Sequence, residues 1–476
     1  MAYHNHLRLT IEYNTAESSR GFIRIVGFTA KPVSIAHDPN DMEATCNAKP
    51  VHNLAETLLK LDLDPKNKRK SLPVTYSYEV RWVETEISWT DRWDVYLLGA
   101  PDDSVAHHMS LLNSFMIVMF LICCIVLILI KALKKDIAVY NELGVSIGDD
   151  DDEDDMSSAG WKLVHGDVFR PPSTSPMALS VLVGSGTQIA VAIIGTLVLS
   201  QTNLINPAMK GQALSNIVLL YAFSGTFSGY TASRLFKLFG GKNWKLNTLL
   251  TAAFFPGLIM AFFLCLNIFL AFYGSAKTVS LFTIICAFLL WVCVASPLVF
   301  IGSFFGFKHD VISVPTRTNQ IARVVPEDNF ITNKWTCVLV GALPFACASI
   351  EVYFLLGAVW MHQYYYLMGY LLTISILIGV TSALISTIMC YIRLTQEDHR
   401  WWWKAFADSA SFGLWIFMYS IWFLVYRLQL VGIMPIVVYV TYMGMVSLAV
   451  GLYTGGIAFL TTFWFNKTIY SAVKLD

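Results

Sequence analysis

A single carboxylate lies deep in one of the apolar stretches of this sequence. Glu351 has long runs of hydrophobic residues on both sides. An ionisable group at membrane depth is costly, so it is either satisfied by a neighbouring helix or used in binding or transport. Gln188 and Asn267 lie in other apolar runs and are candidate hydrogen-bond partners. The sequence leaves two interpretations open: a structural hydrogen bond, and a proton- or ion-linked role.

Pairs of glycines four residues apart recur in three apolar stretches. This spacing lets two helix backbones approach closely, which lipid alone does not drive. Packing within the chain is the simpler interpretation, and contact with a helix of another membrane protein is the more specific one. The candidate contacts to such a client helix are Glu351 and the glycines Gly225, Gly229, Gly302, Gly306, Gly451 and Gly455.

Motifs of known catalytic chemistry are absent from the sequence. It contains no HExxH, no Walker pattern, no GxGxxG followed by a suitable acid, and no GxSxG. Its nine cysteines form no CxxC pair or metal-type Cys/His spacing. His165 and Asp167 fit a structural turn better than a catalytic pair. We therefore expect no enzymatic activity, metal or cofactor, and the lack of a long basic patch argues against a nucleic-acid partner.

Three consecutive tryptophans, Trp401, Trp402 and Trp403, follow a polar run and open an apolar stretch. Tryptophan clusters favour the headgroup zone of a bilayer, so this run predicts anchors at the membrane interface. Asp408 comes shortly after them, and we interpret it as an interfacial carboxylate.

Long apolar runs must position all of these residues. The chain is 55% hydrophobic and only 14% charged, whereas soluble domains usually carry about 25% charged residues. A helix needs about 20 apolar residues to cross the hydrocarbon core. The sequence therefore predicts a polytopic α-helical membrane protein with nine spans, at about 110–130, 178–200, 213–235, 248–273, 279–304, 337–360, 367–392, 405–426 and 434–464.

The lysines and arginines between these runs predict an orientation. Beyond residue 108, eighteen of them fall on one side and only three, Lys210, Lys277 and Arg427, on the other. Basic loops stay in the cytosol. An odd number of spans then places the N-terminal domain in the lumen and the C-terminal tail in the cytosol. The regular alternation of rich and poor loops supports nine spans independently of hydropathy.

The chain is thus divided into a soluble part and a membrane part. Residues 1–108 predict a small β-rich luminal domain, with strands near 22–28 and 73–83 where β-branched and aromatic residues gather. The first span then occupies 109–131, an acidic juxtamembrane cytosolic loop 132–177, the eight-helix membrane domain 178–465 and the tail 466–476. No signal-peptide apolar region opens the chain, so we expect a shortened start or a signal anchor in the first span.

Four strings carry a resemblance to a known family. They are GWKLVHGDVFRPP at 160–172, SFFGFK at 303–308 followed by PTRTNQI at 315–321, QEDHRWWWKAF at 396–406, and ISWTDRWD at 87–94. Together, in this order, they resemble the nonaspanin family, also called the transmembrane 9 superfamily. The resemblance runs over nearly the whole chain and implies that the chain begins within the family's luminal domain.

The resemblance also implies a function. Family membership implies a Golgi or endosomal protein that sorts other membrane proteins and delivers them to the surface, especially clients with glycine-rich or polar spans. The family's terminal lysine-x-acid signal, which coatomer reads for Golgi retention, corresponds to Lys474 and Asp476.

A transporter or channel for a small solute or ion is the alternative. Glu351 and the prolines in or near spans, Pro256, Pro297 and Pro344, are compatible with it. Most spans lack the charged residues that line such pathways, and no pair of interrupted spans indicates an inverted repeat. Flux into proteoliposomes that Glu351→Gln abolishes would favour transport.

Overall fold

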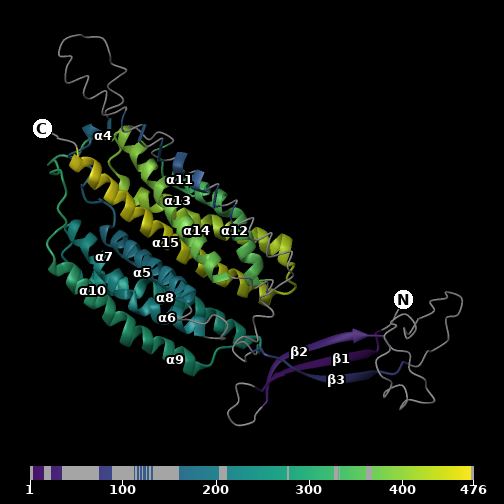
Figure 1. Ribbon diagram of the computed structural model, residues 1–476. Coiled ribbons are helices and arrows are strands. Elements are labelled where there is room, and N and C mark those ends of the chain that lie inside the picture. Colours follow the sequence, from purple (N-terminus) through teal and green to yellow (C-terminus); the bar gives the residue numbers. More distant parts are fainter. Residues whose placement is uncertain are drawn as a thin grey trace. The chain divides into compact units, whose positions relative to one another are not determined.

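The computed structural model describes residues 4–15, 23–34, 74–87, scattered positions in 112–134, 160–202, 212–275, 278–325, 331, 333–360 and 367–472. The chain divides into two compact units, Met1–Leu98 and Gly99–Asp476. The first contains a small sheet and the second a bundle of long helices (Figure 1).

The N-terminal unit contains three strands, β1 (His6–Asn14), β2 (Arg24–Val33) and β3 (Ser77–Glu84). Their order is β2-β1-β3, with β1 antiparallel to β2 and parallel to β3. The predicted strands near 22–28 and 73–83 are confirmed as β2 and β3. Strand β1 was not predicted, although Leu7, Leu9 and Ile11 alternate there with polar residues, which is the pattern of a half-buried strand.

The C-terminal unit is almost entirely helical. Its elements are α4 (Gly160–Leu163), α5 (Pro176–Gln201), α6 (Gln212–Phe223), α7 (Gly225–Leu238), α8 (Trp244–Phe272), α9 (Leu281–Leu290), the π-helical turn η2 (Trp291–Ala295), α10 (Ser296–Lys308), α11 (Lys334–Val340), α12 (Ala342–Trp360), α13 (Leu367–Thr395), α14 (Trp401–Phe423), the π-helical turn η3 (Leu424–Leu428) and α15 (Ile433–Ala472).

Seven of the predicted spans are present among the described residues as helices long and apolar enough to cross a bilayer. They are Pro176–Ser200, Trp244–Phe272, Leu281–Lys308, Trp335–Trp360, Leu371–Thr395, Trp401–Leu428 and Ile433–Ser471. Each begins and ends within a few residues of its predicted position, except the last, which runs on to Ser471. The chain is therefore membrane-embedded and mostly helical.

The other two predicted spans are represented differently. The run 213–235 is divided into α6 and α7 at Ser224, so neither piece is long enough alone. Only scattered positions of the first predicted span are described, and all of those are helical. Nine spans thus stay a prediction.

Small residues allow α5 to sit at the centre of the bundle. It contacts α7 and α8 on one side and α13 and α15 on the other (Figure 1). A Cβ added to Gly186 would collide with the Leu452 carbonyl oxygen of α15, and one added to Gly184 would press on Ala232 of α7. Glycine is required at such crossings because the backbones approach too closely for a side chain.

Several helices are interrupted, and the break between α11 and α12 has a visible cause. The α11–α12 break falls at Gly341, three residues before Pro344. Proline has no backbone N–H to donate to the preceding turn, and its ring clashes with the carbonyl there. Two side chains of α14 take over carbonyls before the break: Ser411 Oγ donates to Cys337 O (2.8 Å) and Trp415 Nε1 to Val338 O (2.8 Å). The predicted span at 213–235 is interrupted as well, between α6 and α7.

Candidate functional site

Two of the strings that carry the family resemblance meet at one end of the helical bundle. The indole N–H groups of the three consecutive tryptophans donate to three backbone carbonyls of the segment before α5. Trp401 bonds Val168 O, Trp402 bonds Arg170 O and Trp403 bonds Thr174 O, each at 2.8 Å. We call these tryptophans with residues 160–174 the tryptophan clamp.

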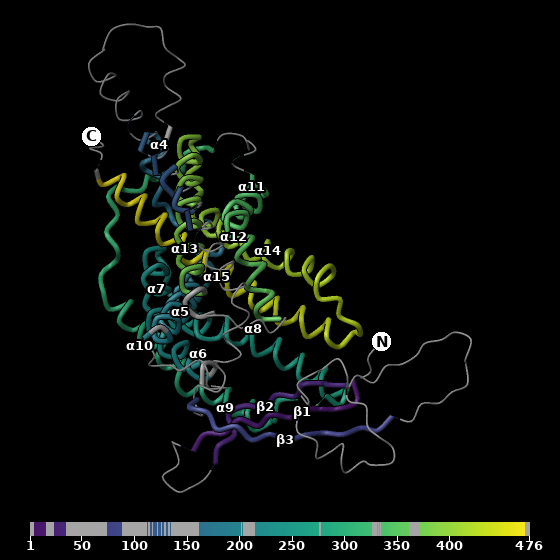
Figure 2. Tube along the Cα trace, turned by 45° about the vertical axis from the view of Figure 1, so that its right-hand side comes forward, coloured from purple at the N-terminus to yellow at the C-terminus, as the bar shows by residue number. Residues whose placement is uncertain are grey.

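The segment 309–325, which contains the PTRTNQI string, also joins the clamp. It can be followed in Figure 2 from the end of α10 to the neighbourhood of α4. Asn319 N donates to Gly166 O (3.0 Å), and Arg170 Nη2 donates to Asn319 O (2.6 Å). Arg323 Nη2 pairs with Glu397 Oε2 at 2.7 Å. The three strings, far apart in sequence, thus form one structural unit.

The end of α15 reaches the same place. Tyr470 Oη donates to Trp161 O (2.6 Å), and the two rings pack edge to face. The segments before α5, after α10, after α13 and at the end of α15 therefore lie at one end of the bundle. These are segments that the basic-residue count assigned to a common side.

Asp167 is the buried charge of the turn that follows α4. Arg170 donates to Asp167 Oδ1 (2.8 and 2.6 Å), and Arg323 N donates to Oδ2 (3.1 Å). Burial alone would raise the pKa of this carboxyl, but these hydrogen bonds outweigh it and hold the pKa below its usual value. His165 and Asp167 lie in a turn, as predicted, and His165 Nδ1 contacts Lys162 O (2.9 Å).

A second buried carboxylate, Asp398, organises the entry to α14. Its Oδ1 accepts hydrogen bonds from Arg400 N (3.0 Å) and Nε (3.2 Å), and its Oδ2 pairs with Lys404. Burial would raise the pKa of Asp398, yet the bonds from Lys404 and Arg400 lower it overall. The chain therefore turns sharply into α14 around a fixed negative charge.

His399 provides a pH-dependent prediction. Burial lowers the pKa of this imidazole despite the nearby carboxylates of Asp167 and Asp398, with Arg170 and Arg400 adding to the depression. A depressed histidine contributes stability that is present above its ordinary pKa of 6.5 and is lost as the pH falls. We expect the unfolding temperature in detergent to drop between pH 7.5 and 5.5, and to drop less in His399→Gln. Equal drops in both proteins would contradict this.

The headgroup-anchor interpretation of the tryptophans is wrong for two of the three. Trp401 is 1% and Trp402 3% exposed, and their rings stack with centroids 4.0 Å apart. A side chain enclosed by protein cannot sit among lipid headgroups. The sequence pattern misled because a Trp-rich helix start looks the same whether lipid or protein covers it.

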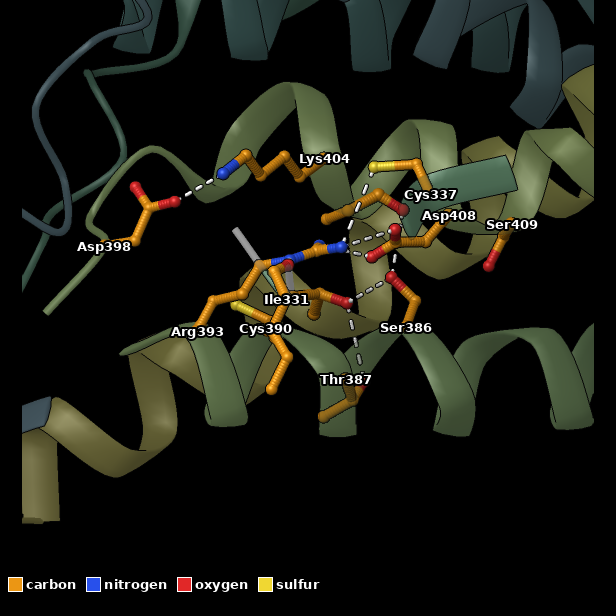
Figure 3. A network of polar contacts seen from close by, with 12 residues as sticks. Ile331, Cys337, Ser386, Thr387, Cys390, Arg393, Asp398, Lys404, Asp408 and Ser409 are labelled. Atoms are coloured by element: carbon orange, nitrogen blue, oxygen red, sulfur yellow. Dashed lines mark hydrogen bonds and ion pairs between the residues drawn. The ribbon is translucent and has the colours of Figure 1, made fainter. Parts of the chain in front are cut away.

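A buried ion pair connects α13 and α14 (Figure 3). Arg393 Nη1 and Nη2 bond Asp408 Oδ2 and Oδ1 at 2.6 and 2.9 Å. The two side chains are 1% and 0% exposed. This two-pronged geometry is the strong form of an arginine–carboxylate pair, and inside a bundle its two charges depend on one another.

Arg393 also connects the pair to the segment before α12. Its Nε donates to Ile331 O (3.2 Å), and its Nη2 approaches Cys337 Sγ at 3.7 Å. One guanidinium thereby ties together α13, α14 and α11 near the α11–α12 break. This arrangement holds three helices in register.

The interpretation of Asp408 as an interfacial carboxylate is therefore wrong. The interfacial interpretation depends on the position of Asp408 near the start of the predicted span at 405–426. The sequence signal that could have predicted the ion pair is the position of Arg393 and Asp408, which flank the short connection between two predicted spans. A charge of each sign on either side of a tight helical hairpin can meet inside it.

Glu351 lies on α12 and is buried. It lines a small pocket with residues of α12, α13 and one described position of the first predicted span: Val118, Pro344, Cys347, Ala348, Ile374, Leu377, Ile378 and Thr381. The two proposed partners bond elsewhere: Gln188 Nε2 donates to Tyr221 O (3.0 Å), and Asn267 Oδ1 accepts from Val279 N (2.8 Å).

All six candidate glycines are buried inside the bundle. A Cβ on Gly229 would collide with Val299 O, and one on Gly302 with Thr226 O, so these two mark the crossing of α7 and α10. The remaining members pack in the same way: Gly225 and Gly306 at that crossing, and Gly451 and Gly455 between α15 and α14. A client helix could reach them only by displacing this chain's own helices.

The terminal residues Lys474 and Asp476 lie outside the described residues. Their point of attachment is described, since α15 ends at Ala472, directly after the Tyr470 contact with the clamp.

The chain matches proteins of one family along its length. The family model described as Endomembrane protein 70 matches residues 1–433. Transmembrane 9 superfamily member 10 of Arabidopsis thaliana is 35% identical over 99% of this chain and 73% of its own length. Transmembrane 9 superfamily member 2 of Homo sapiens is 36% identical over 99% of this chain and 68% of its own length. Member 4 of Rattus norvegicus is 35% identical over 99% of this chain and 72% of its own length. No solved structure gives a significant match. The chain therefore belongs to the transmembrane 9 superfamily, the Endomembrane protein 70 family.

Proposed function

We propose that this chain sorts other membrane proteins in Golgi and endosomal membranes and supports their delivery to the cell surface. One observation carries the proposal: part of the bundle leaves its apolar side chains uncovered. Only 11% of the most apolar window of Leu281–Lys308 is buried, against 67% for α5. Of the ten described residues of α9, none is buried. Such a helix faces lipid or a helix of another protein.

The kind of client follows from the shape of this surface. The exposed side chains of α9 and the adjoining end of α8 are bulky, and they include Phe272, Leu281, Phe282 and Phe288. Glycines on the client helix would let its backbone approach such side chains closely. Since this chain's own glycine pairs are occupied by its own helices, the small residues of the contact must come from the client.

Glu351 is proposed to assist clients that carry a polar residue in a span. Its pocket is otherwise lined mostly by apolar side chains. A hydrogen-bond donor on a client helix that entered this pocket would meet the Glu351 carboxylate in a low-dielectric environment, where a hydrogen bond is stronger than in water. The six glycines keep a role as client contacts only if α10 or α14 moves away.

The client surface can be tested by replacing bulky side chains that the chain leaves exposed. We expect Phe282→Ala combined with Phe288→Ala to reduce co-purification of a client with a glycine-rich span several-fold, because packing contacts are lost. Leu414→Ala with Met418→Ala is the matched control, since these residues are similarly exposed but lie on α14. Undiminished recovery, or an equal loss in the control, would reject α9 as the contact.

The C-terminal tail is proposed to bind coatomer through Lys474 and Asp476. We expect Lys474→Ser to move the protein from Golgi membranes to later compartments, as measured by fluorescence imaging against organelle markers. Lys467→Ser is the control, because it removes a nearby lysine without touching the terminal signal. An unmoved Lys474→Ser protein would mean that retention does not depend on this terminus.

Solute or ion transport is less favoured. The Arg393–Asp408 charges satisfy one another, and the pocket beside Glu351 contains no second charged residue among the positions that the structure describes. A proton or ion pathway commonly needs several such groups along a span.

A further inference from the structure

Three exposed lysines lie near Trp244, in sequence or through contacts of neighbouring residues, where the termini of three helices meet. α7 ends at Leu238, α8 begins at Trp244 and α10 ends at Lys308. From these elements we propose an anionic phospholipid site formed by Lys242, Trp244, Lys245 and Lys308, which we call the lysine patch. The inference depends on the helices being membrane spans and not on the sorting function.

The three helix ends are held together by short-range contacts. After α7 the chain turns back at once: Gly240, at φ 74°, and Gly241 donate to Lys237 O (3.1 Å) and Phe236 O (3.0 Å). Glycine suits this left-handed helix end, because a side chain would be strained there. The turn places Lys242 directly before α8.

The ends of α10 and α8 complete the arrangement. The Trp244 ring lies 6.2 Å from that of Phe307, the residue before Lys308. Lys237 Nζ donates to Phe307 O (2.9 Å) and His309 O (2.7 Å), and Arg234 donates to Asp310 O. These two cations therefore serve the C-terminal carbonyls of α10. The three patch lysines are therefore available to bind a ligand.

The patch has little negative charge to balance it. Lys242, Lys245 and Lys308 are exposed and make no ion pair with any residue that the structure describes. The sequence contains no aspartate or glutamate from 168 to 309, although eight lysines and arginines fall in that stretch. The nearest acid along the chain is Asp310. Uncompensated positive charge concentrated in this way attracts anions.

The position of the patch selects a lipid as the anion. The span of α8 begins here and the Leu281–Lys308 span ends here, so the lysines lie where the hydrocarbon core meets the headgroups. Trp244 is partly exposed, and Lys245 Nζ lies 5.9 Å from its ring centroid. An amphipathic ring beside lysines at this depth suits a phosphate-bearing headgroup whose acyl chains run down the helices.

The site can be measured on the full-length protein in detergent. Fluorescent phosphatidylinositol 4-phosphate is titrated in, followed by anisotropy, with fluorescent phosphatidylcholine as the neutral lipid. The triple variant Lys242→Gln, Lys245→Gln, Lys308→Gln is compared with wild type. We expect at least about a tenfold weaker affinity for the anionic lipid, because each lysine near the surface contributes to the attraction, and no change for the neutral lipid.

Matched variants separate a site from general charge. Lys131→Gln, Lys134→Gln, Arg317→Gln removes the same three charges elsewhere and should leave the affinity within about twofold, whereas replacing the patch lysines by arginine should preserve it. An equal loss in both glutamine triples, or none in the patch triple, would overturn the proposal. Competition by free inositol 1,4-bisphosphate as effective as that by the unlabelled lipid would also overturn it, since the acyl chains would then play no part.

Discussion

Replacing Asp408 by alanine is expected to lower the free energy of unfolding of the membrane domain by about 3–5 kcal/mol, which is the cost of leaving one partner of a buried ion pair alone. Arg393 would keep its charge at a position that is 1% exposed, and among the described residues its remaining hydrogen-bond partners are Ile331 O and Cys337 Sγ. A denaturant titration of the purified protein in detergent micelles measures the loss.

Two further variants show whether the charge itself is responsible. Asp408→Asn keeps a hydrogen-bond acceptor of the same size, so the loss should be smaller than with alanine. The double variant Arg393→Met, Asp408→Leu removes both charges and should be more stable than Asp408→Ala, because apolar replacements of buried pairs are often tolerated. If Asp408→Ala unfolds within about 0.5 kcal/mol of wild type, as ordinary surface substitutions do, the pair is not a stabilising contact.

Replacing Trp401 by alanine should have an effect of similar size. Its ring is buried against Trp402 and Phe459, and its indole N–H satisfies Val168 O. Truncating a buried tryptophan costs about 3–5 kcal/mol, and the freed carbonyl adds to the loss. Hydrogen exchange should also quicken in residues 160–174, since the clamp holds this segment against α14.

Trp403 supplies the control for this prediction. It makes the same kind of bond, to Thr174 O at 2.8 Å, but its bond lies at the solvent-exposed edge. Trp403→Ala should therefore cost clearly less than Trp401→Ala. Equal effects of the two substitutions would show that burial does not determine what each tryptophan contributes, and the clamp would need another explanation.

The membrane spans could be predicted because hydropathy is a local property. A run of about 20 apolar residues has few alternatives to a spanning helix, and seven of the predicted runs are indeed helices of that kind. The strands β2 and β3 were found in the same way, from residue types that favour a pleated sheet. The interruption at Ser224 was not found, because serine in an apolar run carries no strong breaking signal.

The partners of buried polar groups could not be predicted. Arg393 looked like one more loop cation and Asp408 like a surface acid, and nothing local to either residue distinguishes a paired charge from a solvated one. The same holds for Trp401 and Trp402, which enter the interior because the segment after α4 covers them. The glycine pairs were recognised in the sequence. Which helices pack against them depends on how the spans are arranged, and in the structure these are helices of this chain.

That this chain is a membrane-embedded member of its family could be read from the residues alone, since apolar runs and distinctive strings are properties of the linear chain. The folded arrangement was needed to show that three of those strings meet in one structural unit, and that an arginine and an aspartate neutralise each other between α13 and α14. It was also needed to show that the helix termini carrying the patch lysines meet near Trp244. The reason is physical. Crossing a bilayer constrains each segment separately, whereas the pairing of charges and side chains depends on which helices meet, and that follows from close packing throughout the bundle.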